Sequence, residues 1–231
     1  MTEHYDAIVI GAGQAGPSLA ARLGQEGLKT AIIERHRIGG TCVHTGCIPT
    51  KTLVASARVA YLSRRAAEYG VTIDTPVSVD MARVKARKDE IVAASNAGLT
   101  AWVEDMENVT LIRGHARFEG PRSISVNGER LSAERIFINV GARARIPDFP
   151  GLTDVGYLTN SGMMDMDSLP EHLLIVGGSY IGLEFAQMYR RFGAQVTVIE
   201  MQDRLIARED GDVSDAVREI LEGEGVTVRL K

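Results

Sequence analysis

The stretch YDAIVIGAGQAGPSLAARLGQEGLKTAIIE, residues 5–34, decides the fold. A short apolar run leads into the glycine turn GAGQAG, an amphipathic segment follows, and a second apolar run ends at Glu34. A GxGxxG turn between a strand and a helix, with an acid about 20 residues further on, is typical of the βαβ unit that binds a dinucleotide. The pattern therefore predicts a strand, a turn, a helix and a second strand.

Each glycine of this turn has its own physical role. Gly11 allows the tight turn, Gly13 lets a pyrophosphate approach the backbone, and Gly16 lets the helix and the strand pack closely. The start of the helix offers free N–H groups and a partial positive charge to phosphates. We expect Glu34, at the end of the second strand, to accept hydrogen bonds from ribose hydroxyls. The alternative is a glycine turn that serves only packing.

The same pattern returns in HLLIVGGSYIG, residues 172–182, which leads into LEFAQMYRRFG and then into AQVTVIE. In both copies the acid comes 23 positions after the first glycine, at Glu34 and at Glu200. This internal repeat predicts that one chain binds two dinucleotides. In the second copy Ser179 replaces the middle glycine, and we expect its neighbour Gly178 to give the backbone room. The predicted contacts of the second copy are Gly177, Gly178, Ser179, Tyr180, Ile181, Gly182 and Glu200.

Between the copies the patterns are mixed. Residues 52–70 and 79–106 have helical periodicity, and short β-rich pieces follow at residues 108–118, 123–131 and 134–142. Asn-Gly at residues 127–128 is a hairpin signal. These pieces predict a small antiparallel β-meander that is attached to the first nucleotide fold.

The chain is thus predicted to be an α/β protein with two Rossmann-like dinucleotide-binding folds and a small antiparallel meander. The two prolines of RIPDFPG, residues 145–151, indicate a linker. We therefore predict one domain over residues 1–150 and the start of a second over residues 151–231.

Composition restricts the classes of function. The 231 residues are 45% hydrophobic and 24% charged, which is ordinary for a globular protein. A net charge of −4 argues against nonspecific binding to nucleic acid or to an anionic membrane surface. No apolar run approaches the roughly 18 residues of a membrane span, and we expect no secretory signal. Two cysteines do not make a secreted disulfide scaffold, so a cytoplasmic protein is expected.

Both cysteines lie in one stretch, GGTCVHTGCIPTKT, residues 39–52. Pro49 favours a helix that begins close to Cys47, and the N-terminus of a helix lowers the pKa of a thiol. Cys42 lies five positions earlier across a glycine turn, within reach of a disulfide. Lys51 follows Cys47 by about one helical turn, where an ammonium stabilises a thiolate or a reduced ring system. The stretch therefore predicts a switchable disulfide beside a redox cofactor.

Two other interpretations of the cysteine stretch stay open. One is a structural zinc or copper site formed by Cys42, Cys47 and His44, although zinc normally takes four ligands. The other is a pair of inert buried cysteines.

The cysteine stretch and the two nucleotide turns together resemble the pyridine nucleotide-disulfide oxidoreductases, which include glutathione reductase, dihydrolipoamide dehydrogenase and mercuric reductase. GCIPTKT, with threonine before the lysine, is most similar to the mercuric-reductase-like branch. The resemblance covers the whole chain and implies FAD in the first fold and NADH or NADPH in the second. It places the first glycine turn at the FAD pyrophosphate and Glu34 at the ribose. The further FAD contacts that it implies are Gly40, Thr41, Lys51, Gly114, Ala116 and Gly141.

The same resemblance implies the catalytic roles. Lys51 would lie near the flavin and pair with Glu184, Cys47 would be the thiol next to the flavin, and Cys42 would be exposed to the substrate. His44 stands where many members carry asparagine, and we interpret it as a plain surface imidazole.

Glu200 favours NADH, because a carboxylate there bonds the 2′-hydroxyl and repels a 2′-phosphate. Arg204 and Arg208 follow closely, so NADPH also stays open.

Family members are longer than this chain. We therefore expect that the second fold is truncated and that this chain is a fragment, inactive alone. We expect the parent protein to be a homodimer, held together by a domain that is absent here. The parent is expected to pass electrons from NAD(P)H through the flavin to the Cys42–Cys47 disulfide and on to a small-molecule or metal-ion acceptor. The alternatives are a noncatalytic flavin- or nucleotide-binding module that senses redox state, and activity of the glutathione-reductase or dihydrolipoamide-dehydrogenase type.

Overall fold

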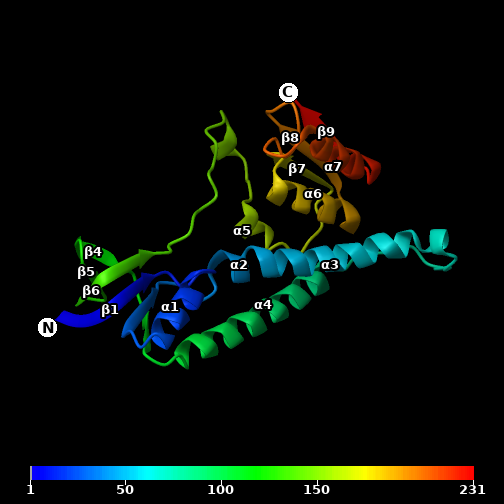
Figure 1. Ribbon diagram of the computed structural model, residues 1–231. Helices are drawn as coiled ribbons and strands as arrows, with labels where there is room; N and C mark the ends of the chain where they lie inside the picture. The colour runs from blue at the N-terminus through cyan, green and yellow to red at the C-terminus, as the bar shows by residue number, and fades with distance from the viewer. Residues whose placement is uncertain (1) are drawn as a thin grey trace. The chain divides into compact units, whose positions relative to one another are not determined.

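The structure is a computed structural model that describes residues 2–231. The chain forms two compact units, one from Met1–Pro49 and Glu90–Thr159, the other from Thr50–Asp89 and Asn160–Lys231. Two long helices, α3 (Cys47–Arg64) and α4 (Met81–Glu104), each contribute residues to both units (Figure 1).

The first unit contains a six-stranded mixed sheet in the order β3-β2-β1-β6-β5-β4. Strand β1 pairs in parallel with β2 and β6, and β2 pairs in parallel with β3. Strands β4, β5 and β6 form the predicted antiparallel meander. Its elements are β1 (Thr2–Ile10), α1 (Gly16–Gln25), β2 (Thr30–Glu34), α2 (Gly40–His44), β3 (Val109–Arg113), β4 (Arg117–Gly120), β5 (Ser123–Val126), β6 (Glu129–Ile138) and the 3₁₀ turn η2 (Leu152–Asp154).

Two details of the meander differ from the sequence prediction. Strand β3 belongs to the parallel part of the sheet, beside β2, and takes no part in the meander. The end of the piece 123–131 and the start of the piece 134–142 belong to one long strand, β6, which pairs with β5 at its start and with β1 along its length. The hairpin signal is confirmed, because Asn127 and Gly128 have φ of 53° and 86° and join β5 to β6.

Strands β1 and β2 are buried on both faces near the glycine turn, which explains why residues 5–10 read as a nearly continuous apolar run. One face packs with the meander through Ile8, Ile33 and Ile124. The other packs Val9 and Ile32 with residues of α1 and α4. The parallel strands are therefore held in a fixed register, and the turn that follows β1 is positioned by the core.

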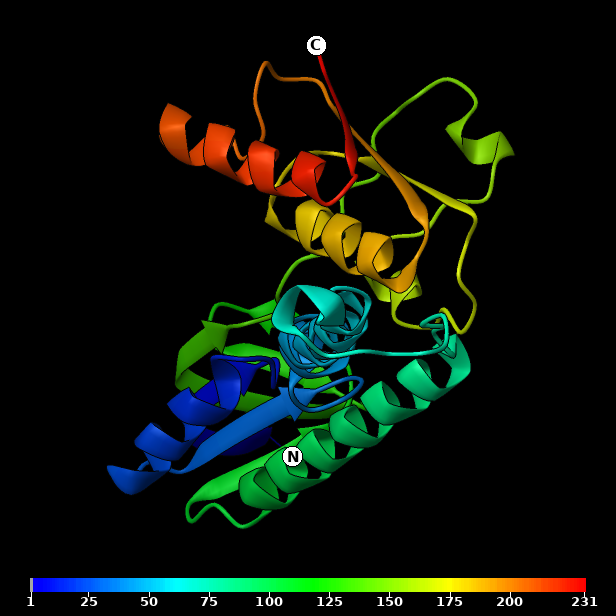
Figure 2. The ribbon, with the colours of Figure 1, turned by 90° about the vertical axis from the view of Figure 1, so that its right-hand side faces the viewer.

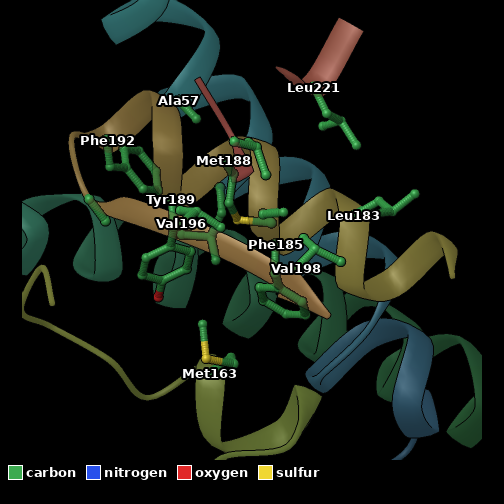
Figure 3. Close-up of a cluster of buried hydrophobic side chains, with 14 of the residues drawn as sticks. Ala57, Met163, Leu183, Phe185, Met188, Tyr189, Phe192, Val196, Val198 and Leu221 are labelled. Carbon is green, nitrogen blue, oxygen red and sulfur yellow. The ribbon is translucent and has the colours of Figure 1, made fainter. Parts of the chain in front are cut away.

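The second unit has a parallel sheet in the order β7-β8-β9, against which helices α6 and α7 pack (Figure 2). Figure 3 shows the apolar core of this unit, in which side chains of α6 such as Phe185 and Tyr189 meet Val196 and Val198 of β8. The elements are η1 (Ala66–Tyr69), α5 (Asn160–Met163), β7 (His172–Val176), α6 (Tyr180–Phe192), β8 (Gln195–Glu200), α7 (Gly211–Gly223) and β9 (Thr227–Leu230).

The fold class is confirmed: each unit contains a β-turn-α-β start of the Rossmann type, and the first also carries the antiparallel meander. Residues 145–149 have no regular structure, as expected of a linker. The domain boundary at residue 150 stays a prediction. Among residues 2–231, no helix is long and apolar enough to cross a membrane.

Candidate functional site

The first glycine turn is built by close backbone contacts. Gly11 has φ of +104°, and its N–H donates to Ile33 O at 2.7 Å. A Cβ at Gly11 would lie 2.2 Å from Asn139 O, and one at Gly16 would lie 2.1 Å from Gly11 O. Because these neighbours are backbone atoms that cannot give way cheaply, both positions require glycine.

Gly13 differs from its two partners in the turn. A Cβ there would meet only Asn139 Nδ2, at 3.9 Å, so the fold itself leaves room for a side chain. The space beside Gly13 and the N-terminus of α1 fit the pyrophosphate of a dinucleotide. Gly40 reaches the same place, because a Cβ on it would lie 2.9 Å from Gly13 Cα. The start of the cysteine stretch therefore touches the glycine turn.

Glu34 holds this turn through both carboxylate oxygens. Oε2 accepts the Ala12 N–H at 2.9 Å, and Oε1 accepts the His36 N–H at 2.8 Å. The backbone oxygen of Glu34 also accepts the Gly114 N–H at 2.9 Å. Each carboxylate oxygen retains a lone pair, so Glu34 can still accept from a ribose hydroxyl.

The second turn repeats these bonds at the corresponding positions. Gly177 has φ of +108° and donates to Ile199 O at 2.8 Å. Glu200 Oε2 accepts the Gly178 N–H at 2.7 Å, and Oε1 accepts the Gln202 N–H at 2.8 Å. The internal repeat in the sequence therefore corresponds to the same set of hydrogen bonds in both turns.

The remaining residues of the second turn begin helix α6. Ser179 is the N-cap, with an extended backbone and no side-chain cap bond, and Ile181 is exposed. A Cβ at Gly182 would lie 2.6 Å from Gly177 O, which parallels Gly16 in the first turn. The Tyr180 hydroxyl donates to Glu209, which raises the pKa of Tyr180.

The segment after β8 packs against this turn. Leu205 is buried, and the Ile206 N–H donates to Gly178 O at 2.8 Å. Arg204 donates to Ala207 O at 3.1 Å. The choice between NADH and NADPH stays a prediction.

The two cysteines are brought together by a turn between two helices. Cys42 is on the five-residue helix α2, and Cys47 is the first residue of α3, as the sequence predicted. Gly46 makes the turn possible, because a Cβ there would lie 2.9 Å from Thr41 O. Cys42 and Cys47 are free thiols, the first half-buried and the second exposed. The turn thus makes the two thiols neighbours, and Cys47 acts on the ionisation of Cys42.

Burial and the neighbouring Cys47 thiol raise the pKa of Cys42. In the reduced chain we therefore expect Cys42 to ionise, and to be alkylated by iodoacetamide, at higher pH than a free cysteine peptide. The measurement is the alkylation rate at Cys42 against pH, read by peptide mass spectrometry. Replacing the neighbour, Cys47→Ser, should move this profile toward lower pH, because the Cys47 side chain no longer raises the pKa of Cys42. An unmoved profile would contradict the coupling.

Lys51 and Glu184 form an ion pair in the second unit. Lys51 lies in the first turns of α3, and Glu184 lies in the first turns of α6. Their side chains are 65% and 36% exposed, so the pair by itself contributes little to stability. The pair therefore matters for where it holds the Lys51 ammonium on α3, and not for the free energy of unfolding.

His44 is not the surface imidazole that we expected from the sequence. Its Nε2 lies 2.9 Å from Ile38 O, and its Nδ1 is buried without a partner. No group of three potential ligands gathers around a metal position anywhere in residues 2–231, so nothing supports the metal-site alternative.

Other predicted contacts lie along the ends of strands in the first unit. Gly114 and Ala116 follow β3, and a Cβ at Gly114 would lie 2.5 Å from Val126. Thr41 is exposed on α2, and Gly141 follows β6 with φ of +67°. These residues remain predicted binding residues.

Sequence reasoning missed Asn139, whose Nδ2 donates to Gly11 O at 3.2 Å and faces the positions of Gly13 and Gly16. The available signal was a polar residue directly after an apolar strand, at the edge where α/β sheets bind ligands.

A family model described as "Pyridine nucleotide-disulphide oxidoreductase" matches residues 5–231. The mercuric reductase of Lysinibacillus sphaericus is 32% identical over 98% of this chain and 41% of its own length. The probable pyridine nucleotide-disulfide oxidoreductase RclA of Escherichia coli K12 is 36% identical over 98% of this chain and 49% of its own length. The dihydrolipoyl dehydrogenase of Bacillus subtilis is 36% identical over 98% of this chain and 50% of its own length.

A solved structure, the Cu(II) complex of the HOCl-induced flavoprotein disulfide reductase RclA from Escherichia coli, superposes with a TM-score of 0.85. The two sequences are 36% identical, and the superposition covers 100% of this chain and 49% of the RclA chain. The present chain thus spans about half the length of these three relatives.

Proposed function

The chain belongs to the pyridine nucleotide-disulphide oxidoreductase family, and from this membership we propose that it is the nucleotide-binding part of a flavoprotein disulfide reductase. In this proposal the first turn binds FAD and the second binds NADH or NADPH. Electrons reach the Cys42–Cys47 disulfide and pass to an acceptor. The parent protein acts as a homodimer, and its acceptor is a small disulfide or a metal ion.

One observation carries the proposal. Cys42 and Cys47 are neighbouring free thiols on a loop whose Gly40 touches the glycine turn at Gly13. A disulfide in this place is next to the space where the dinucleotide is proposed to bind. This proximity is what a transfer of electrons from a bound cofactor requires.

When bound, FAD supplies a group that takes a hydride from a reduced pyridine nucleotide and releases an electron pair to a disulfide. The disulfide takes up that pair and two protons, and Cys42 and Cys47 become thiols. With a disulfide acceptor, one thiolate of the chain attacks an acceptor sulfur and expels the other sulfur as a thiolate. The second cysteine then displaces the remaining half, which restores the Cys42–Cys47 bond.

The other predicted residues have supporting roles in this proposal. Glu34 and Glu200 hold the two turns and accept from ribose hydroxyls. The Lys51–Glu184 pair fixes the ammonium on the helix that Cys47 begins. An ammonium near the cofactor stabilises negative charge on it.

The test is a reductive titration of the FAD-loaded chain under anaerobic conditions with dithionite. We expect uptake of about four electrons per chain, two for the flavin and two for the disulfide. Cys42→Ser and Cys47→Ser are each expected to take up about two electrons, because neither can form the bond. The same samples should show two additional reactive thiols only in the reduced wild-type chain.

Two results would contradict the proposal. One is a wild-type chain that takes up no more electrons than the serine variants. The other is a chain that fails to retain FAD, which would leave the first turn as a packing feature.

A further inference from the structure

Helix α2 cannot hold Cys42 in place by itself. It has five residues, and isolated helices shorter than about 12 residues are marginal in water. Its N-cap, Gly39, has a left-handed backbone and provides no side-chain bond. Some tertiary contact must therefore fix the position of Cys42 relative to Cys47.

His44, the last residue of α2, provides such a contact. Its Nε2 lies 2.9 Å from Ile38 O, two residues before the helix begins its first turn. Asn96 of α4 donates its Nδ2 to the same oxygen at 2.7 Å. The Ile38 carbonyl thus accepts from two side chains, one on the cysteine-bearing helix and one on α4.

Ile38 is a fixed anchor for this bond. Its side chain is 1% exposed and packs in the core with Val9, Ile32 and Val103. The neighbouring backbone is also held, since the Gly39 N–H donates to Ala12 O at 2.7 Å. A group that bonds Ile38 O is therefore tied to the parallel strands.

The geometry also defines which nitrogen carries the proton. A distance of 2.9 Å to a carbonyl requires a hydrogen on Nε2, since two lone pairs would repel there. The same hydrogen prevents Nε2 from accepting from Asn96 Nδ2, 3.3 Å away. Nδ1 is buried and has no hydrogen-bond partner among the described residues. The hydrogen bond from Nε2 to Ile38 O is therefore the one through which the His44 side chain holds α2.

We propose that His44 is a positioning residue for Cys42, which it holds against Cys47 by tying α2 to the Ile38 carbonyl. This inference rests on the proposed function of the cysteine pair. A disulfide requires its two Cβ atoms within a narrow range of distance and angle. When α2 is released from Ile38, the thiols spend less time in that arrangement. The equilibrium between dithiol and disulfide then moves toward the dithiol.

The test is the equilibrium constant for the reaction of the reduced chain with oxidised glutathione, which yields the chain disulfide and two molecules of glutathione. His44→Asn shortens the side chain so that its amide lies where Nδ1 was and no longer reaches Ile38. We expect this variant to lower the equilibrium constant about tenfold, as for one lost hydrogen bond. His44→Gln places an amide N–H near the position of Nε2, and we expect it to stay within about twofold of wild type.

Asn96→Ala is the matched control for a purely structural effect. It removes the other donor to Ile38 O but leaves α2 tied, so it should lower thermal stability without moving the equilibrium constant. The inference is overturned if His44→Asn leaves the constant unchanged, if His44→Gln does not restore it, or if Asn96→Ala lowers it equally. A wild-type chain that forms no disulfide with glutathione overturns the proposed function first, and this inference with it.

Discussion

Gly13→Ala is expected to leave the fold intact and to weaken FAD binding about 100-fold, equivalent to about 3 kcal/mol. An alanine Cβ at this position meets no atom within 3.8 Å in the chain itself, since Asn139 Nδ2 is nearest at 3.9 Å. With a pyrophosphate bound, that Cβ would compete for the same space. The free energy of unfolding should be unchanged or higher by up to about 1 kcal/mol, because alanine restricts the unfolded chain.

The matched control is Gly11→Ala in the same turn. Its Cβ would lie 2.2 Å from Asn139 O and its backbone has φ of +104°, so we expect a loss of about 3 kcal/mol or more in stability. Trp102, the only tryptophan of the chain, reports unfolding of the first unit by fluorescence. Quenching of flavin fluorescence gives the affinity. A Gly13→Ala variant that binds FAD like wild type would show that this space is not the pyrophosphate site.

Glu224→Leu is expected to destabilise the second unit by about 3 kcal/mol. Glu224 binds Arg191 through two bonds, at 2.7 Å to Nε and 2.5 Å to Nη2, and the two side chains are 10% and 11% exposed. The guanidinium also stacks on Tyr61 at 4.5 Å. Without the carboxylate, a largely buried charge is left against the face of the Tyr61 ring. Hydrogen exchange of peptides from α6 and β8 measures the loss within this unit.

Two further variants separate the charge effect from a loss of packing. Arg191→Met with Glu224→Leu removes the unpaired charge as well, so this double variant should recover most of the lost stability. Glu222→Ala, in the last turn of α7 two residues before Glu224, breaks an exposed ion pair with Arg218 and should cost no more than about 0.5 kcal/mol. If the double variant is as unstable as the sum of its single variants, the unpaired charge is not the cause.

Local sequence signals were sufficient for most elements. The alternation of apolar runs, glycine turns and amphipathic segments predicted β1, α1 and β2 and the matching β7, α6 and β8, because these signals act over a few residues. Asn127-Gly128 predicted its hairpin for the same reason, since both residues need a positive φ that asparagine and glycine tolerate. The start of α3 at Cys47 followed from Pro49.

The misses concern residues whose partners are distant in sequence. His44 bonds Ile38, only six positions away, but it also lies beside Asn96, which is 52 positions away and donates to the same Ile38 oxygen. Asn139 meets Gly11 across 128 positions. The place of β6 at the centre of the sheet depends on its pairing with β1, which no local pattern encodes. Such contacts form only when the strands and helices assemble.

The amino-acid sequence alone determined that the chain repeats a dinucleotide-binding start twice and carries a cysteine pair between the copies, because backbone conformation at glycine, proline and asparagine is a local property. Tertiary structure alone decided that Asn139 bonds Gly11 O beside the first glycine turn and that Asn96 of α4 bonds Ile38 O before the cysteine stretch. Each of these bonds joins segments far apart in the sequence, which only packing brings together.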